Sequence, residues 1–415
     1  MDVVASCAAG LDVHQNSVVV CLLTKDGGRK MQKEFRRFGT MTKDLRELAR
    51  WLAEARCESA VMEGTGVYWM PVYAALEEAG VPATIGNARH IAKVPGRKTD
   101  VNDAEWLATL ARHGLVRPSF VPPALLREVR DLLRYRRKLV EHRSAERLRV
   151  LKHLELAGIK LASVASDAFG VSGTAILRAL AAGNSTPEEM AKLAKGLLKK
   201  KVKLLEDALD GRFTEHHRLI LRIQLQLLDD LQKSLDQLEA AIAERLKPFS
   251  DVLKNLQTIP GIDTIGAATL VAELGVDMSV FPTARHAAAW AGLAPGQNES
   301  AGKSRAAPTT RGNKHLKTVL AECALAISRM KGTWLRDKFY RVKARRGHQR
   351  ALIAIAHKLL RMAYAILRDN KPYHELGPEY LDRKDTAKTA QRLIGRLRNL
   401  GYEVDVRPTA EPSAA

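Results

Sequence analysis

The sequence is poor in cysteine and contains no long apolar run. Its four cysteines stand far apart, at Cys7, Cys21, Cys57 and Cys323. That spacing excludes the clustered thiols of zinc sites and of disulfide-rich domains, so we expect small buried residues in a reducing cytoplasm. No stretch reaches the ~18 uncharged apolar residues of a membrane-spanning helix. The N-terminus has no basic flank before an apolar run, so we expect neither a signal peptide nor a membrane partner.

Acidic residues are scarce relative to basic ones. The chain has 46 Asp and Glu against 67 Lys and Arg, which gives a formal net charge of +21. A charge of this size predicts a polyanionic partner and favours DNA or RNA over an anionic membrane. The alternative is a basic surface that serves solubility alone.

The order of apolar patterns predicts an α/β domain followed by helical domains. The chain has 415 residues, of which 46% are hydrophobic, enough for two or three cores. Residues 5–115 show three strand patterns, then helix, strand, helix, strand and helix. The proline-rich segment PSFVPPA, residues 118–124, predicts a domain boundary. We therefore assign residues 1–123 to an N-terminal α/β domain.

A basic helical and coiled-coil region is expected at residues 124–250. Its first helix carries a dense run of Lys and Arg, including Arg134 and Arg137. We expect this run to contact a nucleic-acid backbone, although a solvated helix face is the usual reason for such charge. The second helix, residues 217–247, repeats leucine and isoleucine at alternating steps of three and four, which predicts a coiled-coil seam of about two heptads. Sequence leaves open whether this seam pairs within the chain or between protomers.

The remaining chain is expected to be mostly helical. In residues 251–372, IPGI (259–262) resembles the turn of a helix-hairpin-helix, which would offer backbone N–H groups to a phosphate or else be buried between two core helices. Residues 290–317 form a long Gly-, Ser- and Thr-rich loop of the kind that is often functional. Its candidate nucleic-acid contacts are Lys303, Arg305, Arg311 and Lys314. Residues 373–415 are predicted to be a basic extension with a disordered tail.

The segment GRKTDVNDAE, residues 96–105, concentrates acids in a basic chain. A helix start explains it if Thr99 or Asp100 is the N-cap, because acids are favoured in a first turn. A Mg²⁺ site also explains it, because Asp100 and Asp103 are three apart and share one helix face. Carboxylates suit Mg²⁺, which shares oxygen ligands with phosphates. Glu105 is expected to be a surface residue.

The element order of the first domain resembles the RuvC-type RNase H-like fold. That fold carries an acid on its first strand, another at the end of its fourth, and a pair at its last helix, which here match Asp12, Glu63, Asp100 and Asp103. From about residue 8 to 370 the chain resembles the DEDD transposases of bacterial insertion sequences, the IS110 family, also called bridge recombinases. The matching motifs are GLDVH (10–14), VMEGTGVYW (61–69), NARHIAKVPGRKTDVNDAEWLATLARHGLVRPSFVPP (87–123), IPGI (259–262) and AWAGLAPGQNESAGKSR with TTRGNKHL (289–316).

The resemblance implies a reaction and a set of partners. It implies that the four acids hold Mg²⁺, that Arg97 and Lys98 contact phosphates nearby, and that Ser300 is the nucleophile that forms a phosphoserine link to DNA. A structured bridge RNA would pair with donor and target DNA. The protein would work in the bacterial cytoplasm, at the nucleoid, as a dimer and tetramer whose active sites are shared between protomers. Strand exchange would pass through a Holliday-junction-like intermediate.

Other functions stay open on the residues alone. Ser300 is one hydroxyl among several in its loop, so a RuvC-like nuclease or junction resolvase that cuts by water attack fits the same acids. A site-specific DNA invertase of the same family fits as well, and so does a nucleic-acid-binding protein without catalysis. We find no helix-turn-helix or zinc-finger pattern that reads bases, which agrees with specificity supplied by a guide RNA.

Overall fold

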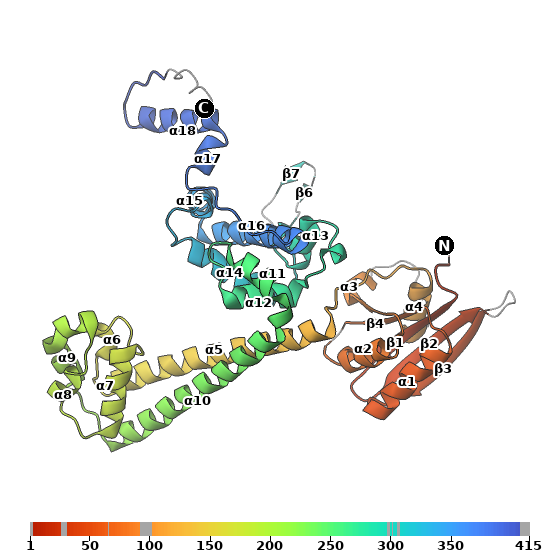
Figure 1. The fold of residues 1–415 in the computed structure, drawn as a ribbon, viewed down its shortest axis with the longest axis horizontal. Helices are drawn as coiled ribbons and strands as arrows, with labels where there is room; N and C mark the ends of the chain where they lie inside the picture. The colour runs from red at the N-terminus through yellow and green to blue at the C-terminus, as the bar shows by residue number, and fades with distance from the viewer. Residues whose placement is uncertain are drawn as a thin grey trace. The chain divides into compact units, whose positions relative to one another are not determined.

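The computed structural model describes residues 3–25, 31–64, 66–91, 102–296, 299–300, 302–304 and 308–406. The chain divides into two compact units, Met1–Val121 and Pro122–Ala415, and Figure 1 shows the elements of each. Within the described ranges, no helix has both the length and the apolar character needed to cross a membrane.

The first unit contains a mixed sheet of five strands. These are β1 (Cys7–Val13), β2 (Val18–Lys25), β3 (Met31–Phe38), β4 (Ser59–Glu63) and β5 (Ala83–Gly86), in the order β3-β2-β1-β4-β5. β1, β2 and β3 form an antiparallel meander, whereas β4 and β5 run parallel to β1. This topology is consistent with an RNase H-like domain and confirms the predicted order of strands and helices.

Helices cover both faces of this sheet. They are α1 (Thr42–Glu54), α2 (Trp69–Glu78), α3 (Ala88–Ile91) and α4 (Asp103–Arg112). Alternate side chains of a strand point to opposite faces, so β1 feeds two cores. Ala9 and Leu11 pack in the core that holds the buried side of α1 and α2. Ala8 packs instead with residues of α4, among them Leu107 and Leu110.

The second unit begins with two long helices that pack side by side (Figure 1). They are α5 (Ala124–Leu156) and α10 (Glu215–Arg245). Arg136 Nε donates to Glu239 at 2.8 Å and Arg245 Nε donates to Glu128 at 3.0 Å, which requires an antiparallel pair. The predicted seam residues Leu235 and Ile242 are buried, so the seam packs within the chain. The chain segment that connects the two long helices forms α6 (Leu161–Val164), α7 (Val171–Ala182), α8 (Pro187–Ala191), η1 (Gly196–Lys201) and α9 (Val202–Leu209).

The rest of the second unit is built around α16 (His348–Asp369). Its buried side packs against helices that precede it in the chain. The elements that contact it are α11 (Ser250–Gln257), η3 (Met278–Val280), α13 (Ala284–Trp290), α14 (Lys314–Ile327) and α15 (Trp334–Arg346). This part of the unit also contains η2 (Lys247–Phe249) and α12 (Thr264–Leu274), and α12 packs against α5, α11 and α14. A two-stranded sheet, β6 (Glu299–Ser300) and β7 (Lys303–Ser304), lies between α13 and α14. The last helices are α17 (Tyr380–Arg383) and α18 (Thr386–Asn399).

The turn between α11 and α12 packs against α14. Gly261 has a φ of +79°, and a Cβ there would lie 2.7 Å from Cγ1 of Ile327. Ile259 and Ile262 on either side of the turn are buried. Asp263 then caps α12, because its Oδ1 accepts the Gly266 N–H at 2.7 Å. These contacts favour the interpretation of a turn buried between core helices over that of a turn offered to phosphate.

Candidate active site

Two of the predicted acids meet at the carboxyl ends of neighbouring strands. β1 and β4 are parallel, with Gly10 opposite Val61 and Leu11 opposite Met62. One further step of this register sets Asp12 beside Glu63. Because side chains alternate along a strand, Asp12 points to the same face as Ala8, and Glu63 to the same face as Val61. Ala8 and Val61 both pack in the core that holds α4.

A close backbone approach brings Asp103 to the same end of the sheet. Gly10 lies directly under α4: a Cβ there would be 2.8 Å from the carbonyl carbon of Leu107 and nearer still to backbone atoms of Ala104 and Ala108. Only glycine permits this contact. The first turn of α4 is therefore held over the carboxyl half of β1, so Asp103, the first residue of α4, shares one region with the acids of β1 and β4.

The structure revises the expected helix start. α4 begins at Asp103, and its N-cap is Asn102, whose Oδ1 accepts the Ala104 N–H at 3.0 Å. The prediction of Thr99 or Asp100 as N-cap is wrong. Asp100, Arg97 and Lys98 lie outside the described residues, so their predicted roles stay predictions. Asp103 remains a first-turn acid, which the helix dipole favours.

Glu105 is not the surface residue that we expected. Its side chain is 23% exposed and forms an ion pair with Lys33 of β3. It also lies near a buried thiol: burial first, and then the Glu105 charge, raise the pKa of Cys21 to about 11. Ala104 and Ala108 pack beside Cys21 in one small core. Glu105 therefore ties α4 to the meander and helps to fix the position of Asp103.

The acids at this edge have the chemistry of a hard-cation site. Asp12, Glu63 and Asp103 offer only carboxylate oxygens, which Mg²⁺ prefers. His14 Nε2 lies 3.0 Å from Asp12 Oδ2 and so orients that carboxylate. Within the described ranges, no three or more His, Cys, Asp or Glu are grouped closely enough to hold a metal. The donor types thus fit a divalent cation, and the fourth predicted ligand lies outside the described residues.

The predicted serine loop is a hairpin at its base. Asn313 N–H donates to Trp290 O at 3.0 Å, Thr310 N–H to Ala294 O at 3.2 Å, and Gly296 N–H to Pro308 O at 3.1 Å. The sequence predicted a long loop. These hydrogen bonds instead pair its first and last residues as the two arms of a hairpin. The backbone contacts hold the two ends of the segment together where α13 ends and α14 begins.

At the tip of this hairpin, Ser300 lies on β6 opposite Lys303 on β7. The side chains of Ser300 and Lys303, and the whole of Arg305, lie outside what the structure describes. Arg311 and Lys314 are exposed near the base of the hairpin. Their predicted contact with nucleic acid stays a prediction, and so does the role of Ser300 as nucleophile.

A buried carboxylate that the sequence analysis missed anchors the hairpin. Glu273 of α12 is 2% exposed and accepts two hydrogen bonds from Arg134 of α5, both at 3.0 Å. Asn313 Nδ2 donates to Glu273 at 2.6 Å, while Asn313 Oδ1 caps α14 by accepting the His315 and Leu316 N–H groups. The available signal was a single acid inside the apolar run TIGAATLVAEL.

The two arginines predicted to contact nucleic acid from α5 have carboxylate partners inside the unit. Arg134 is bound to buried Glu273, with Arg130 3.0 Å from the same carboxylate. Arg137 Nη2 donates to Glu322 of α14 at 2.8 Å. These bonds give both side chains a structural role, and their contact with nucleic acid stays a prediction.

Known sequences resemble both halves of the chain. A model of IS110-type DEDD proteins described as "Transposase" matches residues 9–159, and one described as "Transposase IS116/IS110/IS902 family" matches residues 253–341. The transposase for insertion sequence element IS1111A of Coxiella burnetii is 25% identical over 333 residues, which cover 78% of this chain and 81% of that protein. The uncharacterized 42 kDa protein of insertion element IS900 from Mycobacterium paratuberculosis is 26% identical over 299 residues, 67% of this chain and 73% of its own. The pilin gene-inverting protein of Moraxella bovis is 33% identical over 122 residues, 28% of this chain and 37% of its own.

Each matched region contains one of the two groups of candidate residues. The first region contains Asp12, Glu63 and Asp103 on their sheet, and the second contains the hairpin and its anchor Glu273. The chain belongs to the IS110 family of DEDD transposases, which are enzymes that act on DNA.

Proposed function

We propose that this transposase exchanges DNA strands through a covalent phosphoserine intermediate, with Mg²⁺ at the acidic edge of its sheet and a structured bridge RNA as guide. The observation that carries the proposal is that Asp12, Glu63 and Asp103 all lie at the same end of the sheet. Carboxylate oxygens are the ligands that Mg²⁺ prefers, and a bound cation can in turn hold a phosphate.

The acids are assigned the task of holding the metal. Asp12, Glu63 and Asp103, with Asp100 as the expected fourth ligand, provide the oxygen donors. Bound Mg²⁺ supplies charge stabilisation at the phosphate. The contact of His14 with Asp12 at 3.0 Å sets the direction in which that carboxylate points. The tie between Glu105 and Lys33 keeps α4, and hence Asp103, in place.

Ser300 is assigned the role of nucleophile. Its Oγ attacks a phosphodiester phosphorus, the new P–O bond forms as the bond to a deoxyribose oxygen breaks, and that oxygen leaves as a hydroxyl. A serine hydroxyl needs activation for this step. The phosphoserine conserves the phosphoester bond, so a hydroxyl of another strand can reverse the reaction and restore Ser300. Asn313 anchors the base of the hairpin that carries this serine to Glu273.

A covalent-adduct trap tests the mechanism. The full chain is expressed with the flanking DNA of its element and target DNA, Mg²⁺ is supplied, and the mixture is denatured. We expect protein covalently bound to DNA from the wild type and from Ser304→Ala, a matched control in the same hairpin, and none from Ser300→Ala. Adduct formation by Ser300→Ala refutes the serine assignment. Full activity of a folded Asp12→Asn variant refutes the metal assignment.

The proposed partners are donor and target DNA, a structured bridge RNA and further copies of the chain, as a dimer and tetramer. The basic composition supports a nucleic-acid partner. RNA that copurifies with the chain and whose removal abolishes recombination is the expected result. Recombination that persists after ribonuclease treatment contradicts the guide role. Light scattering of the complex with DNA measures the number of protomers.

Two alternatives have distinct outcomes in the same assays. A RuvC-like nuclease or junction resolvase nicks DNA in an Mg²⁺-dependent reaction that needs Asp12 but leaves no adduct. A DNA invertase is favoured by the similarity of the chain to the pilin gene-inverting protein. A plasmid with two sites in inverted orientation separates inversion from insertion: exclusive inversion of the intervening segment supports the invertase.

A further inference from the structure

A cluster of lysines without carboxylate partners lies where α15, α16 and α17 meet. Lys338 is on α15, Lys358 is on α16, and Lys384 directly follows α17. Lys338 and Lys358 are half-buried. In the described part of the chain, none of these three lysines forms an ion pair, whereas five other lysines of the unit do.

The charges around these lysines are themselves positive. Burial, and then Lys384, Arg345 and Arg341, lower the pKa of Lys338. Burial, and then Lys338, Arg361 and Lys384, lower the pKa of Lys358. Desolvation and like-charge repulsion both disfavour a protonated amine. Three protonated lysines held close together therefore lower the stability of the folded protein. An anion bound among them would offset that loss.

Three acids of this region are engaged elsewhere. Asp382 accepts from Arg341 at 2.7 Å and from Arg392 at 3.2 Å. Glu375 accepts the backbone N–H of Trp334 and the hydroxyl of Tyr373. Asp385 caps α18 by accepting the Lys388 N–H. Moving one of these carboxylates to a lysine would leave its present hydrogen-bond donor without an acceptor. The three lysines therefore stay without a carboxylate partner.

Aromatic packing holds the cluster in a fixed geometry. Trp334 of α15 and Tyr380 of α17 pack edge to face with centroids 5.6 Å apart. Trp334 Nε1 donates to the Tyr373 hydroxyl at 2.7 Å. Lys384 Nζ lies 5.9 Å from the Tyr380 ring. The short helix α17 therefore carries Lys384 on a support that is anchored to α15.

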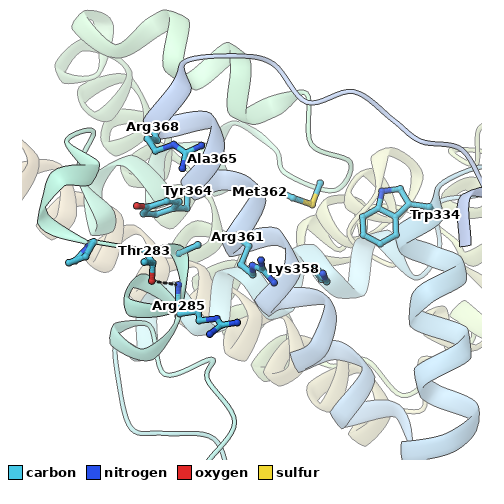
Figure 2. Close-up of a pocket in the computed structure, with 11 residues that line it drawn as sticks. Thr283, Arg285, Trp334, Lys358, Arg361, Met362, Tyr364, Ala365 and Arg368 are labelled. Atoms are coloured by element: carbon cyan, nitrogen blue, oxygen red, sulfur yellow. Dashed lines mark hydrogen bonds between the residues drawn. The ribbon is translucent and has the colours of Figure 1, made fainter. Parts of the chain in front are cut away.

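Lys358 and Lys338 each line a basic groove. The first groove has a volume of about 620 Å³ and is lined by Lys358, Arg361, Arg285 and Arg368 without any carboxylate. Figure 2 shows Lys358 and Arg361 next to each other on α16, with Arg285 coming from α13. The second groove, of about 900 Å³, lies between α15 and α18, and Arg and Lys residues outnumber the two carboxylates, Asp337 and Asp385, in its lining. Both volumes exceed what a single small anion would fill.

We propose that Lys338, Lys358 and Lys384, with Arg361 beside them, bind the phosphate backbone of duplex DNA. The ligand is DNA because the family acts on DNA, and lysine contacts to phosphates fix position without reading sequence. Most of this surface lies beyond the transposase match, which ends at residue 341. The inference uses the family's action on DNA and is independent of the serine mechanism.

The test is DNA binding by the full chain in EDTA, measured by fluorescence anisotropy over a range of salt concentrations. The variant is K338Q/K358Q/K384Q. The matched control is K233Q/K247Q/K254Q, which removes the same charge from lysines that already pair with a neighbouring acid. Each lost phosphate contact makes the negative slope of log K against log salt shallower by about 0.9. We therefore expect the slope of the variant to be shallower by about 2–3 and its affinity at low salt to be at least tenfold weaker.

Three outcomes decide the proposal. Restored slope in K338R/K358R/K384R, together with a melting temperature of the glutamine variant at or above that of the wild type, supports it, because the cluster is costly without its ligand. Equal slopes in the variant and wild type overturn it. Loss of binding to an RNA duplex with unchanged binding to DNA also overturns it and assigns the surface to RNA. Because EDTA removes Mg²⁺, failure of the catalytic proposal would leave these results unchanged.

Discussion

Gly10→Ala tests how packing positions the acidic site. The new Cβ would lie 2.8 Å from the carbonyl carbon of Leu107 and closer to backbone atoms of Ala104 and Ala108. Backbone atoms cannot rotate away as a side chain can, so α4 must retreat by about 1 Å to restore a carbon–oxygen separation of ~3.3 Å. Overpacking of this kind costs about 1–3 kcal/mol.

The same displacement moves Asp103 away from Asp12 and Glu63. A misplacement of about 1 Å at a reacting centre costs on the order of 100-fold in rate. We therefore expect Gly10→Ala to fold, to melt at a lower temperature, and to form covalent adduct about 100-fold more slowly. A higher Mg²⁺ requirement should accompany the slower rate, because the displaced carboxylate belongs to the proposed metal site.

The assay combines calorimetry, hydrogen exchange of α4 amides and adduct yield against Mg²⁺ concentration. Gly395→Ala is the control: it is a helical glycine with nothing within 4 Å of the added Cβ, so alanine there stabilises α18 by up to about 1 kcal/mol. Unchanged α4 exchange and unchanged activity in Gly10→Ala would refute the argument that this glycine sets the position of Asp103.

Two further predictions concern buried charge and buried thiols. Glu273→Ala leaves Arg134 and Arg130 without their carboxylate and should lower the free energy of unfolding by about 3–5 kcal/mol. The control Glu322→Ala removes an exposed ion pair and should lower it by at most ~1 kcal/mol. Equal losses for the two variants in urea unfolding would contradict the role of Glu273. Burial raises the pKa of Cys21 to about 11 and that of Cys57 to about 12. The stability that these thiols contribute is therefore complete below pH 9.0, the ordinary thiol pKa, and is lost as the pH rises through the folded values. Unfolding measured between pH 8 and 12 should show this loss, and Cys21→Ala should weaken it; a pH-independent stability would contradict the prediction.

The sequence predicted those features that depend on local pattern. Apolar and β-branched runs predicted the strands, and the resemblance to the RuvC-type fold singled out Asp12 and Glu63. The helix start was placed wrongly because Thr99, Asp100 and Asn102 are all good N-cap residues, so propensity alone could not choose among them. The structure selects Asn102, whose side chain accepts the Ala104 N–H, and α4 therefore starts at Asp103.

Features that depend on distant pairing could not be predicted. Arg130 donates to the backbone of Glu273 across 143 positions of sequence, and nothing near either residue indicates the other. The arms of the serine hairpin were also missed. Their pairing rests on backbone bonds such as Thr310 N–H to Ala294 O, and neither arm shows the alternation of apolar and polar residues that predicts a strand.

The distribution of paired charge changes how the net charge of +21 is interpreted. The basic run of α5 seemed to lack acids that could neutralise it, yet α10, α12 and α14 supply them: Arg136 pairs with Glu239, Arg134 with Glu273 and Arg137 with Glu322. The lysines at α15, α16 and α17 are fewer, but their neighbours are cations. An anionic ligand gains most where the protein has left positive charge unpaired and partly desolvated. The proposed lysine surface therefore predicts that the absence of a carboxylate partner in the fold locates the DNA-binding surface better than the density of Lys and Arg along a helix.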